Sequence, residues 1–343
     1  MTERPISPRG SSPPTIRDVA QRAGVAPGTV SNVLTGRRPV AEPLRRSVLE
    51  AVEALGYRPN QLASNLRMRQ TRSIGVVVPD LTNPFFATLI ENIEKLAGRD
   101  GYQILLMSSH ENESADAERI RSLIARQVDG LIIAPSVDAI GRLLGELVSA
   151  PPIVVIDRAL ESAGCDTVAA DNAAGAREGC RYLLELGHRD IAFLATSREL
   201  ANIRERVEGF SAAMRDYGVS HRARVLFGGL SIDSCRSAIE QELRRADRPT
   251  AVFSGAYVAT LGAVKAIRAV DLEFPKDISL LGFDDADWMT ALRPYISTVA
   301  QPLDAISQQA WTILKTRLDA GDQPATHTLI ACSLKIREST RPP

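Results

Sequence analysis

The sequence predicts an α/β protein in which two doubly wound parallel-sheet lobes follow a small all-α domain. From residue 74 onward, short apolar runs alternate with helical patterns, which is the βαβ order of parallel sheets. Before that point, apolar residues recur at helical spacing. The apolar runs lie at 74–78, 103–107, 130–134, 153–156, 191–194, 251–253 and 278–281, and helical patterns lie at 85–98, 174–186, 203–217 and 257–269. So many strands indicate two sheets rather than one.

The composition is that of a globular protein and argues against several classes. The chain has 343 residues, of which 44% are hydrophobic and 24% are charged. Its apolar runs are far shorter than the roughly 18 residues of a membrane span. Residues 1–14 are rich in Pro and Ser and lack the apolar core of a secretory signal. The four cysteines lie far apart, without metal-ligand spacing. We expect a cytoplasmic protein with a disordered N-terminal arm and packed free thiols, without a metal, cofactor or membrane partner.

The charge is distributed unevenly although the net charge is zero. Residues 15–72 contain ten Arg and four Asp or Glu, whereas residues 73–343 contain 29 Lys or Arg and 36 Asp or Glu. A basic front end on an acidic body indicates that the front end meets a polyanion. A solvated charged face is the alternative interpretation of the same pattern.

Three short helices are expected in the basic segment. Thr15 and Asp18 begin the first helix as a capping box, and Gly24 ends it. Pro27 begins the second, where a proline is tolerated because its nitrogen would have no helical partner. The third is marked by apolar residues at helical spacing, Leu44, Val48, Val52 and Leu55. This pattern matches a helix-turn-helix unit, with a small structural bundle as the alternative.

The second of these helices carries small polar residues where a surface helix ordinarily carries Glu and Lys. A recognition helix enters the major groove N-terminus first, so bulky early residues would hold it away from the bases. Pro27 and Gly28 can lie against base edges, and Asn32 has the paired donor and acceptor that suits adenine. Further contacts with bases or phosphates are expected from Thr15, Thr29, Ser31, Arg37 and Arg38.

Residues 59–72 form a basic linker that contains a short helical pattern. Asn60 can cap a helix over 61–66. Leu62 and Leu66 lie four residues apart on one face, so two copies can pair and push an apolar wedge into a minor groove. Together with Ala63, these residues are candidate DNA contacts of a hinge, and an ordinary linker is the alternative.

Doubly wound folds bind ligands at the carboxyl ends of their strands. Arg donates a planar fork of N–H groups and Asp accepts two hydroxyls, so Arg206 and Asp284 suit a polyhydroxylated ligand. Tyr257 can stack on a ligand ring or fill the space that a smaller ligand leaves. Structural roles remain open as well, with Arg206 in a local salt bridge and Asp284 as a helix cap. The candidate residues at predicted strand ends are Phe85, Phe86, Asp157, Arg206, Tyr257 and Asp284, of which the two phenylalanines can equally be core residues.

Three stretches near the front resemble the LacI/GalR family of bacterial transcription repressors: TIRDVAQRAGVAPGTVSNVL, VEALGYRPNQLASNLR and RSIGVVVPD. The likeness covers nearly the whole chain and continues, in the family's order, through NPFF, VDGLII, LGHRDIAFL, RVEGF, RPTAVF, ISLLGFDD and LKIREST. The resemblance implies a helix-turn-helix headpiece at 15–58, a hinge helix and linker at 59–72 that folds on operator DNA, and a core at 73–343. This core would resemble periplasmic sugar-binding proteins, with lobes at about 73–170 plus 300–330 and about 171–299 plus 331–343.

The resemblance also implies roles for individual residues. Pro27, Gly28 and Asn32 occupy positions that read bases, and Leu66 occupies the position that wedges into the operator centre. Effector contacts or pocket-lining positions are implied for Phe85, Phe86, Asp157, Arg206 and Asp284.

Two departures from the family pattern stand out. Ala26 replaces the usual Ser or Thr before the recognition helix, and the loss of that cap costs about 1 kcal/mol. Ala256 and Tyr257 replace the usual Asn-Asp pair, which holds hydroxyls in members that respond to sugars.

We therefore expect a homodimeric transcriptional regulator, more often a repressor than an activator, that binds palindromic double-stranded operator DNA. The expected effector is a carbohydrate, with a nucleoside or another small metabolite as the alternative. The rival classes are an enzyme and a solute-binding protein. The chain lacks GxSxG, P-loop, HExxH and GxGxxG patterns, and its basic headpiece argues against the second rival. The effector, the operator and its genes, and the direction of the response do not follow from the sequence.

Overall fold

The computed structural model describes residues 14–35, 38–57, 71–136, 150–158, 164–321 and 323–343. The chain divides into two compact units, Met1–Thr71 and Arg72–Pro343. Residues 1–13 of the predicted arm, Arg37 and the predicted hinge contacts Asn60, Leu62, Ala63 and Leu66 lie outside the described residues. Within the described part, none of the helices has the length and apolar character that a membrane crossing requires.

The first unit is a three-helix domain formed by α1 (Ile16–Ala23), α2 (Pro27–Thr35) and α3 (Glu42–Leu55). The predicted capping box is confirmed, because Asp18 N donates to Thr15 Oγ1 at 3.4 Å and Thr15 N donates to the Asp18 carboxylate at 2.7 Å. Gly24 ends α1 in the left-handed region, as the sequence predicts. The core of the unit consists of five buried side chains, Val19, Ala20, Val30, Val48 and Ala51.

One residue of the predicted stripe on α3 does not reach this core. Leu44 is 44% exposed, whereas Val48 is fully buried. Val52 and Leu55 are half-buried and pack against the core. Since α3 has 14 residues and α1 and α2 have only 8 and 9, the first turn of α3 finds little apolar surface beneath it. The predicted helix is confirmed, and Leu44 is the exposed member of the four apolar residues that mark it.

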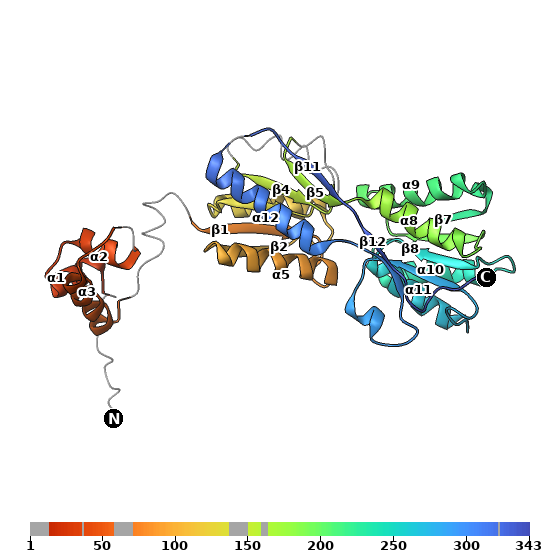
Figure 1. The fold of residues 1–343 in the computed structure, drawn as a ribbon, viewed down its shortest axis with the longest axis horizontal. Helices are drawn as coiled ribbons and strands as arrows, with labels where there is room; N and C mark the ends of the chain where they lie inside the picture. The colour runs from red at the N-terminus through yellow and green to blue at the C-terminus, as the bar shows by residue number, and fades with distance from the viewer. Residues whose placement is uncertain (1–13, 36–37, 58–70, 137–149, 159–163, 322) are drawn as a thin grey trace, which may run out of the picture. The chain divides into compact units, whose positions relative to one another are not determined.

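The first lobe of the second unit contains a six-stranded sheet in the order β11-β5-β4-β3-β1-β2. Its strands are β1 (Ser73–Val78), β2 (Gln103–Ser108), β3 (Gly130–Ile133), β4 (Ile153–Ile156), β5 (Asp166–Ala170) and β11 (His327–Ile330). Helices α5 (Pro84–Arg99) and α12 (Leu303–Ala320) pack on one face of this sheet, and α6 (Glu113–Ala125) packs on the other. In Figure 1, α12 from the end of the chain lies beside strands from the beginning of the unit.

The second lobe contains another six-stranded sheet in the order β12-β10-β9-β8-β6-β7. Its strands are β6 (Ile191–Ala195), β7 (Ala223–Phe227), β8 (Ala251–Ser254), β9 (Ser279–Phe283), β10 (Ser297–Ala300) and β12 (Ser333–Lys335). One face is covered by α8 (Asn172–Glu185) and α9 (Ala201–Asp216), and the other by α10 (Ile232–Leu243) and α11 (Tyr257–Ala269). Among the described strands, β12 pairs antiparallel with β10 and the other pairings are parallel. The predicted fold class is confirmed.

The apolar runs predict seven of these strands and miss β5, β7, β10, β11 and β12. β11 and β12 are partly exposed, so polar residues interrupt their apolar character. β5 is fully buried but begins with Asp166, a charged residue that no apolar run would include. The structure satisfies this carboxylate with Arg317 of α12, whose Nε and Nη2 each donate at 2.8 Å.

The chain passes between the two lobes three times. The crossings lie between β5 and α8, between β10 and α12, and between β11 and β12 (Figure 1). Each sheet is thereby completed by a strand from the distant end of the chain, and the carboxyl ends of the strands in both lobes border shared cavities. The lobes therefore form one unit around a cleft.

Helices α8 and α9 approach each other closely at Gly209. A Cβ atom on Gly209 would lie 2.0 Å from Ala173 O, a backbone atom that cannot move aside. Gly98 of α5 is also helical, but a Cβ atom there would meet only Glu94 Oε1, at 4.0 Å. The packing of α8 against α9 therefore requires a glycine at position 209, whereas the surroundings of position 98 would accept a side chain.

We predict that Gly209→Ala lowers the free energy of unfolding by about 2 kcal/mol, because the added methyl group forces the two helices apart. Gly98→Ala should raise it by up to about 1 kcal/mol, because alanine is the better helix former at an open site. Urea unfolding followed by circular dichroism measures both. Equal effects of the two substitutions would contradict the close approach of α8 and α9.

Candidate DNA interface and effector site

The exposed part of α2 consists of small residues. Pro27 and Gly28, at its N-terminus, are exposed. Val30 is fully buried and fixes the helix on the domain core. The polar residues that remain half-buried on its surface are Thr29, Ser31 and Asn32. This helix end therefore offers backbone and short polar groups to a partner.

Nothing within the described part of the first unit requires a glycine at position 28. A Cβ atom on Gly28 would meet no atom within 4 Å. Its backbone also lies outside the left-handed region that favours glycine, since no positive φ is recorded for it. The small size of this residue therefore points to a constraint from outside the unit.

The first unit also exposes Thr15 and several arginines. Thr15 is exposed, but its hydroxyl and its backbone N–H already bond to Asp18 in the capping box. These hydrogen bonds hold the pKa of Asp18 below its ordinary value. The exposed arginines of the described unit are Arg17, Arg22, Arg38, Arg45 and Arg46. The described unit thus combines five exposed arginines with an exposed helix end made of small residues.

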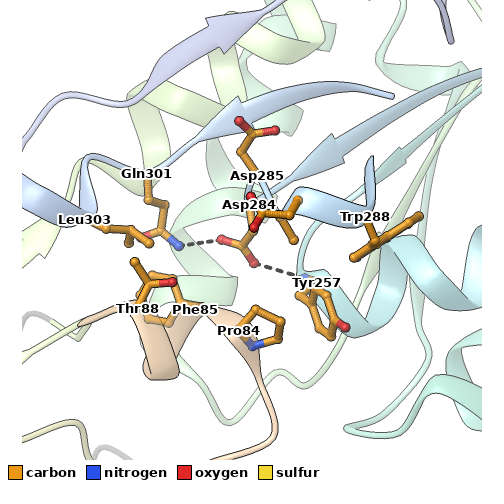
Figure 2. A pocket seen from close by; sticks show the side chains of 11 residues that line it. Pro84, Phe85, Thr88, Tyr257, Asp284, Asp285, Trp288, Gln301 and Leu303 are labelled. Atoms are coloured by element: carbon orange, nitrogen blue, oxygen red, sulfur yellow. Dashed lines mark hydrogen bonds between the residues drawn. The ribbon is translucent and has the colours of Figure 1, made fainter. Parts of the chain in front are cut away.

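Two adjoining cavities lie where the strand ends of the two lobes meet. The smaller one, which we name the polar chamber, has a volume of about 90 Å³ and is lined by, among others, Asp80, Glu111, Asp157, Arg158, Asn202 and Arg206. The larger one, which we name the aromatic chamber, has a volume of about 250 Å³ and is lined by, among others, Pro84, Tyr257, Trp288 and Leu303 (Figure 2). Phe85, Asp284 and Gln301 line both chambers.

Arg206 is held in one orientation at the polar chamber. It is 2% exposed. Its Nε donates to Asn172 Oδ1 at 2.8 Å and its Nη1 donates to Gly255 O at 2.9 Å. Its guanidinium carbon also lies 3.8 Å from the centre of the Phe283 ring. A guanidinium fixed in this way can recognise a ligand without first losing side-chain entropy.

Asp157 is the most deeply buried acid of the polar chamber. Asn202 Nδ2 donates to Asp157 Oδ2 at 3.1 Å, and Arg158 Nε lies 3.8 Å from the same oxygen. Burial raises the pKa of Asp157 above its ordinary value, although the charges of Arg158 and Arg206 act in the opposite direction. Burial likewise raises the pKa of Glu111. The free protein thus carries incompletely stabilised carboxylates at this position.

Asp284 joins three elements at the boundary between the chambers. Tyr257 N, at the start of α11, donates to Asp284 Oδ2 at 3.0 Å, and Gln301 Nε2 donates to Oδ1 at 2.6 Å (Figure 2). The first bond caps α11 from a neighbouring strand end, because Ala256 provides no side-chain cap. Asp284 is therefore a helix cap and also a lining residue of both chambers.

Asp157 and Asp284 share a strained backbone at equivalent places. Each directly follows a strand, and their φ angles are 69° and 74°. The left-handed region costs a non-glycine residue roughly 1–2 kcal/mol. Each N–H donates to a neighbouring strand, to Val168 O at 3.1 Å and to Val299 O at 2.9 Å. The sheets therefore hold both carboxylates in place against this strain.

Buried polar atoms without a hydrogen-bond partner concentrate in the two chambers. Six such side-chain atoms occur among the described residues, and five belong to residues that line a chamber. These five are Glu111 Oε2, Arg158 Nε, Asn202 Oδ1, Gln301 Oε1 and Trp288 Nε1. Because buried polar groups in proteins are nearly always bonded, this concentration makes the two chambers the candidate ligand site.

The structure brings most of the predicted effector residues together. Asp157, Arg206 and Phe86 line the polar chamber, and Tyr257 lines only the aromatic chamber. Phe86 is 4% exposed and Phe85 8% exposed, and both also belong to the core of the first lobe. The core and the ligand-facing interpretations of these two residues are therefore compatible.

Several lining residues were missed by the sequence reasoning. Arg158, Asn202 and Trp288 fall in the segments 157–158, 196–206 and 284–288, which the sequence reasoning selected as strand-end loops without naming these residues. The structure places Asn202 at the start of α9 and Trp288 in a short 3-10 helix. Gln301 follows β10, a strand that the apolar runs do not reveal. Glu111 follows β2 by three residues and carries no pattern of its own.

Comparison with known proteins matches both units. Residues 15–60 match the family described as bacterial regulatory proteins of the lacI family. Residues 71–323 match the family described as periplasmic binding proteins and the sugar binding domain of the LacI family. These two matches cover nearly all of the described chain.

Individual relatives agree with these matches over almost their full lengths. Catabolite control protein A of Priestia megaterium is 32% identical over 95% of this chain and 99% of its own. The HTH-type transcriptional repressor CytR of Escherichia coli (strain K12) is 30% identical over 95% of this chain and 96% of its own. The solved lac repressor dimer bound to operator and the anti-inducer ONPF is 26% identical, with a TM-score of 0.87 over 96% of this chain and 100% of that chain.

We predict that Asp157→Asn raises the melting temperature at pH 7. A carboxyl whose folded pKa is raised binds its proton more tightly in the folded state, so the charged form destabilises the fold as pH rises above the ordinary value of 3.8. Removal of that charge should therefore stabilise the protein at pH 7, by an amount that shrinks as the pH falls toward 4. Thermal melts between pH 4 and pH 8 measure this.

Asp285→Asn is the matched control with the opposite sign. Burial alone would raise the pKa of Asp285, but hydrogen bonds from Arg337, Lys335 and Thr298 hold it at about 2. At pH values above the ordinary pKa of 3.8, the Asp285 carboxylate stabilises the fold. This stabilisation is lost as the pH falls toward 2. The substitution should cost about 2 kcal/mol at pH 7. Destabilisation of similar size by both substitutions would contradict the assignment for Asp157.

Proposed function

The chain belongs to the LacI family of bacterial regulatory proteins, and from this premise we propose how its two units divide the work of an effector-controlled transcriptional regulator. The first unit binds double-stranded operator DNA, and the cleft of the second unit binds a small carbohydrate effector. The concentration of unpartnered polar atoms in the cleft is the observation that carries the second part of this proposal. The first part is carried by the exposed small residues at the start of α2 and by the excess of arginine over acidic residues in residues 15–72.

α2 acts as the recognition helix in this proposal. Pro27 and Gly28 enter the major groove first and lie against base edges, because neither holds the helix away. Asn32 bonds adenine through its amide, and Thr29 and Ser31 supply further polar contacts. Phosphate contacts are assigned to Thr15, Arg37 and Arg38.

The linker and the operator complete the DNA complex. We assign Asn60, Leu62, Ala63 and Leu66 to a hinge helix that orders on operator DNA, where Leu66 wedges into the minor groove at the centre of the site. This assignment rests on the family membership and on the sequence pattern. Two hinge helices require two chains, so the regulator acts as a homodimer on a palindromic site.

The effector controls DNA binding through the closure of the two lobes. Asp157 and Arg206 bond its hydroxyls, while Phe85 and Phe86 give the chamber an apolar wall. Because the first lobe follows the linker directly, a change in lobe closure moves the starting points of the two hinges. The effector can shift this equilibrium only by its difference in affinity for the two states, typically about 1–3 kcal/mol.

Three headpiece variants test the division of roles on DNA. Gly28→Ala should not lower the melting temperature of the protein but should lower operator affinity about tenfold, since the methyl group meets no atom of the described unit and would meet only DNA. Asn32→Ala should remove the preference at one base pair per half-site, worth about 1–3 kcal/mol. Arg38→Ala should weaken binding to all sequences and flatten the salt dependence.

Fluorescence anisotropy on an operator selected from random DNA, and on a scrambled duplex, provides the measurement. The scrambled duplex is the control that separates sequence-specific loss from general loss. If Gly28→Ala reduced binding to neither duplex, or if Asn32→Ala and Arg38→Ala behaved alike on both, the proposed orientation of α2 would be wrong.

The homodimer gives a further prediction. Sedimentation velocity at micromolar concentration should show a dimer in the absence of DNA, because the core supplies the interface and the DNA merely aligns the headpieces. A complex with operator should contain two chains per duplex. A monomer under both conditions would refute the symmetric arrangement.

A further inference from the structure

The aromatic chamber extends the proposed effector site into a second compartment. Its volume of about 250 Å³ exceeds the 90 Å³ of the polar chamber. Pro84 and Phe85 belong to α5 of the first lobe, and Tyr257 and Trp288 belong to the second (Figure 2). A ligand in this compartment would therefore contact both lobes at once.

The walls of the aromatic chamber suit a flat ring. Tyr257 and Trp288 are half-buried and pack edge to face, with ring centres 6.5 Å apart and an angle of 75° between the rings. Pro84 lies opposite Tyr257, and Leu303 closes the side next to Gln301 (Figure 2). Aromatic and apolar walls of this kind bind planar rings by stacking and by burial of apolar surface.

Two polar atoms in the chamber wall have no partner among the described residues. Trp288 Nε1 is a buried donor, and Gln301 Oε1 is a buried acceptor. Gln301 cannot turn its amide around freely, because its Nε2 already donates to Asp284 Oδ1 at 2.6 Å. A ring that carries its own polar atoms would satisfy both positions, which a hydrocarbon ring would leave unbonded.

The charges of both chambers disfavour an anion. None of the residues that line the described aromatic chamber is Lys or Arg, whereas Asp284 and Asp287 contribute to it. Asp285 also lines it, but ion pairs with Lys335 and Arg337 neutralise its carboxylate. In the polar chamber two arginines face four acids, Asp80, Glu111, Asp157 and Asp284. A phosphate or carboxylate on the ligand would meet net repulsion in either chamber.

The polar and aromatic chambers adjoin at shared residues. Phe85, Asp284 and Gln301 line both, so the Asp284 carboxylate lies at the boundary and can be contacted from either side. From these observations we infer that the two chambers form one site for an uncharged glycoside whose aglycone is a flat aromatic or heteroaromatic ring. The sugar occupies the polar chamber and the ring occupies the aromatic chamber. This inference rests on the proposed effector function of the cleft and specifies the class of effector.

Aryl glycosides and nucleosides share this chemistry, and matched compounds distinguish them. The panel pairs methyl with phenyl β-D-glucoside, methyl with phenyl β-D-galactoside, and methyl β-D-ribofuranoside with adenosine and with cytidine. The 5′-monophosphates of both nucleosides complete it. Isothermal titration of the full chain should show a ring-bearing compound binding at least about tenfold more tightly than its methyl partner, and no gain from the phosphate.

Three variants then test whether the higher affinity for ring-bearing compounds arises in the aromatic chamber. Tyr257→Ala keeps the backbone N–H that bonds Asp284, and it should lower the affinity for the ring-bearing compound about tenfold while leaving the methyl partner unchanged. Trp288→Phe keeps a ring but removes the Nε1–H donor. It should therefore lower the affinity for compounds whose ring offers an acceptor more than it lowers the affinity for phenyl glycosides. Tyr217→Ala is the control, because this exposed aromatic residue of the same lobe lines neither chamber.

Several results would overturn the inference. One is equal affinity for a methyl compound and its ring-bearing partner, and another is tighter binding of a 5′-monophosphate than of its nucleoside. The inference would also fail if the higher affinity of the ring-bearing compound survived Tyr257→Ala, or if no member of the panel bound. Operator binding is measured on the same preparation with and without each compound. Operator binding together with no binding of any compound shows a wrong effector class, whereas no operator binding in either condition shows a failure of the proposed function.

Discussion

The three crossings between the lobes are the constraint on which the rest of the second unit depends. They place strands from the end of the chain in both sheets, with β11 in the first and β12 in the second. The strand ends that carry Asp157 and Asp284 thereby border one cleft, although 127 residues separate them in the sequence. Gln301 lies on a crossing itself and bonds Asp284, so the cleft wall and the connection between the lobes are partly the same residues.

Acidic residues in this unit follow two opposite designs. Buried Asp166 and half-buried Asp285 lie beside arginines that bond them directly, and their pKa values lie below the ordinary value. Buried Asp157 and half-buried Glu111 lack enough compensation, and their pKa values lie above it. The first pair of carboxylates stabilises the fold at neutral pH. The second pair lowers the free energy of unfolding at neutral pH, and in the proposed function its oxygens accept hydrogen bonds from ligand hydroxyls. This contrast is expected where a site is selected for binding rather than for stability.

Sequence reasoning found the site residues whose chemistry is unusual for their position. Asp157 and Asp284 stand out as charged residues directly after apolar strands, and Arg206, which the sequence placed in a strand-end loop, lies within α9 instead. The structure places all three at the cleft. Tyr257 was found as well, but its separation from the polar chamber was not foreseen. Asn202 and Gln301 carry ordinary amides, so only their unpartnered oxygens, visible once neighbours are known, mark them as part of the site.

The sequence by itself determined the elements whose signals are local. A capping box at Thr15, a proline at the start of α2 and apolar periodicity specify helices, because those interactions span only a few residues. The family resemblance added the order of the domains. The tertiary structure alone decided that Leu44 is exposed, that buried Asp166 can begin a strand opposite Arg317, and that the cleft divides into a polar and an aromatic chamber. These outcomes depend on contacts between distant residues, and the free energy of a contact exists only after the fold has brought its partners together.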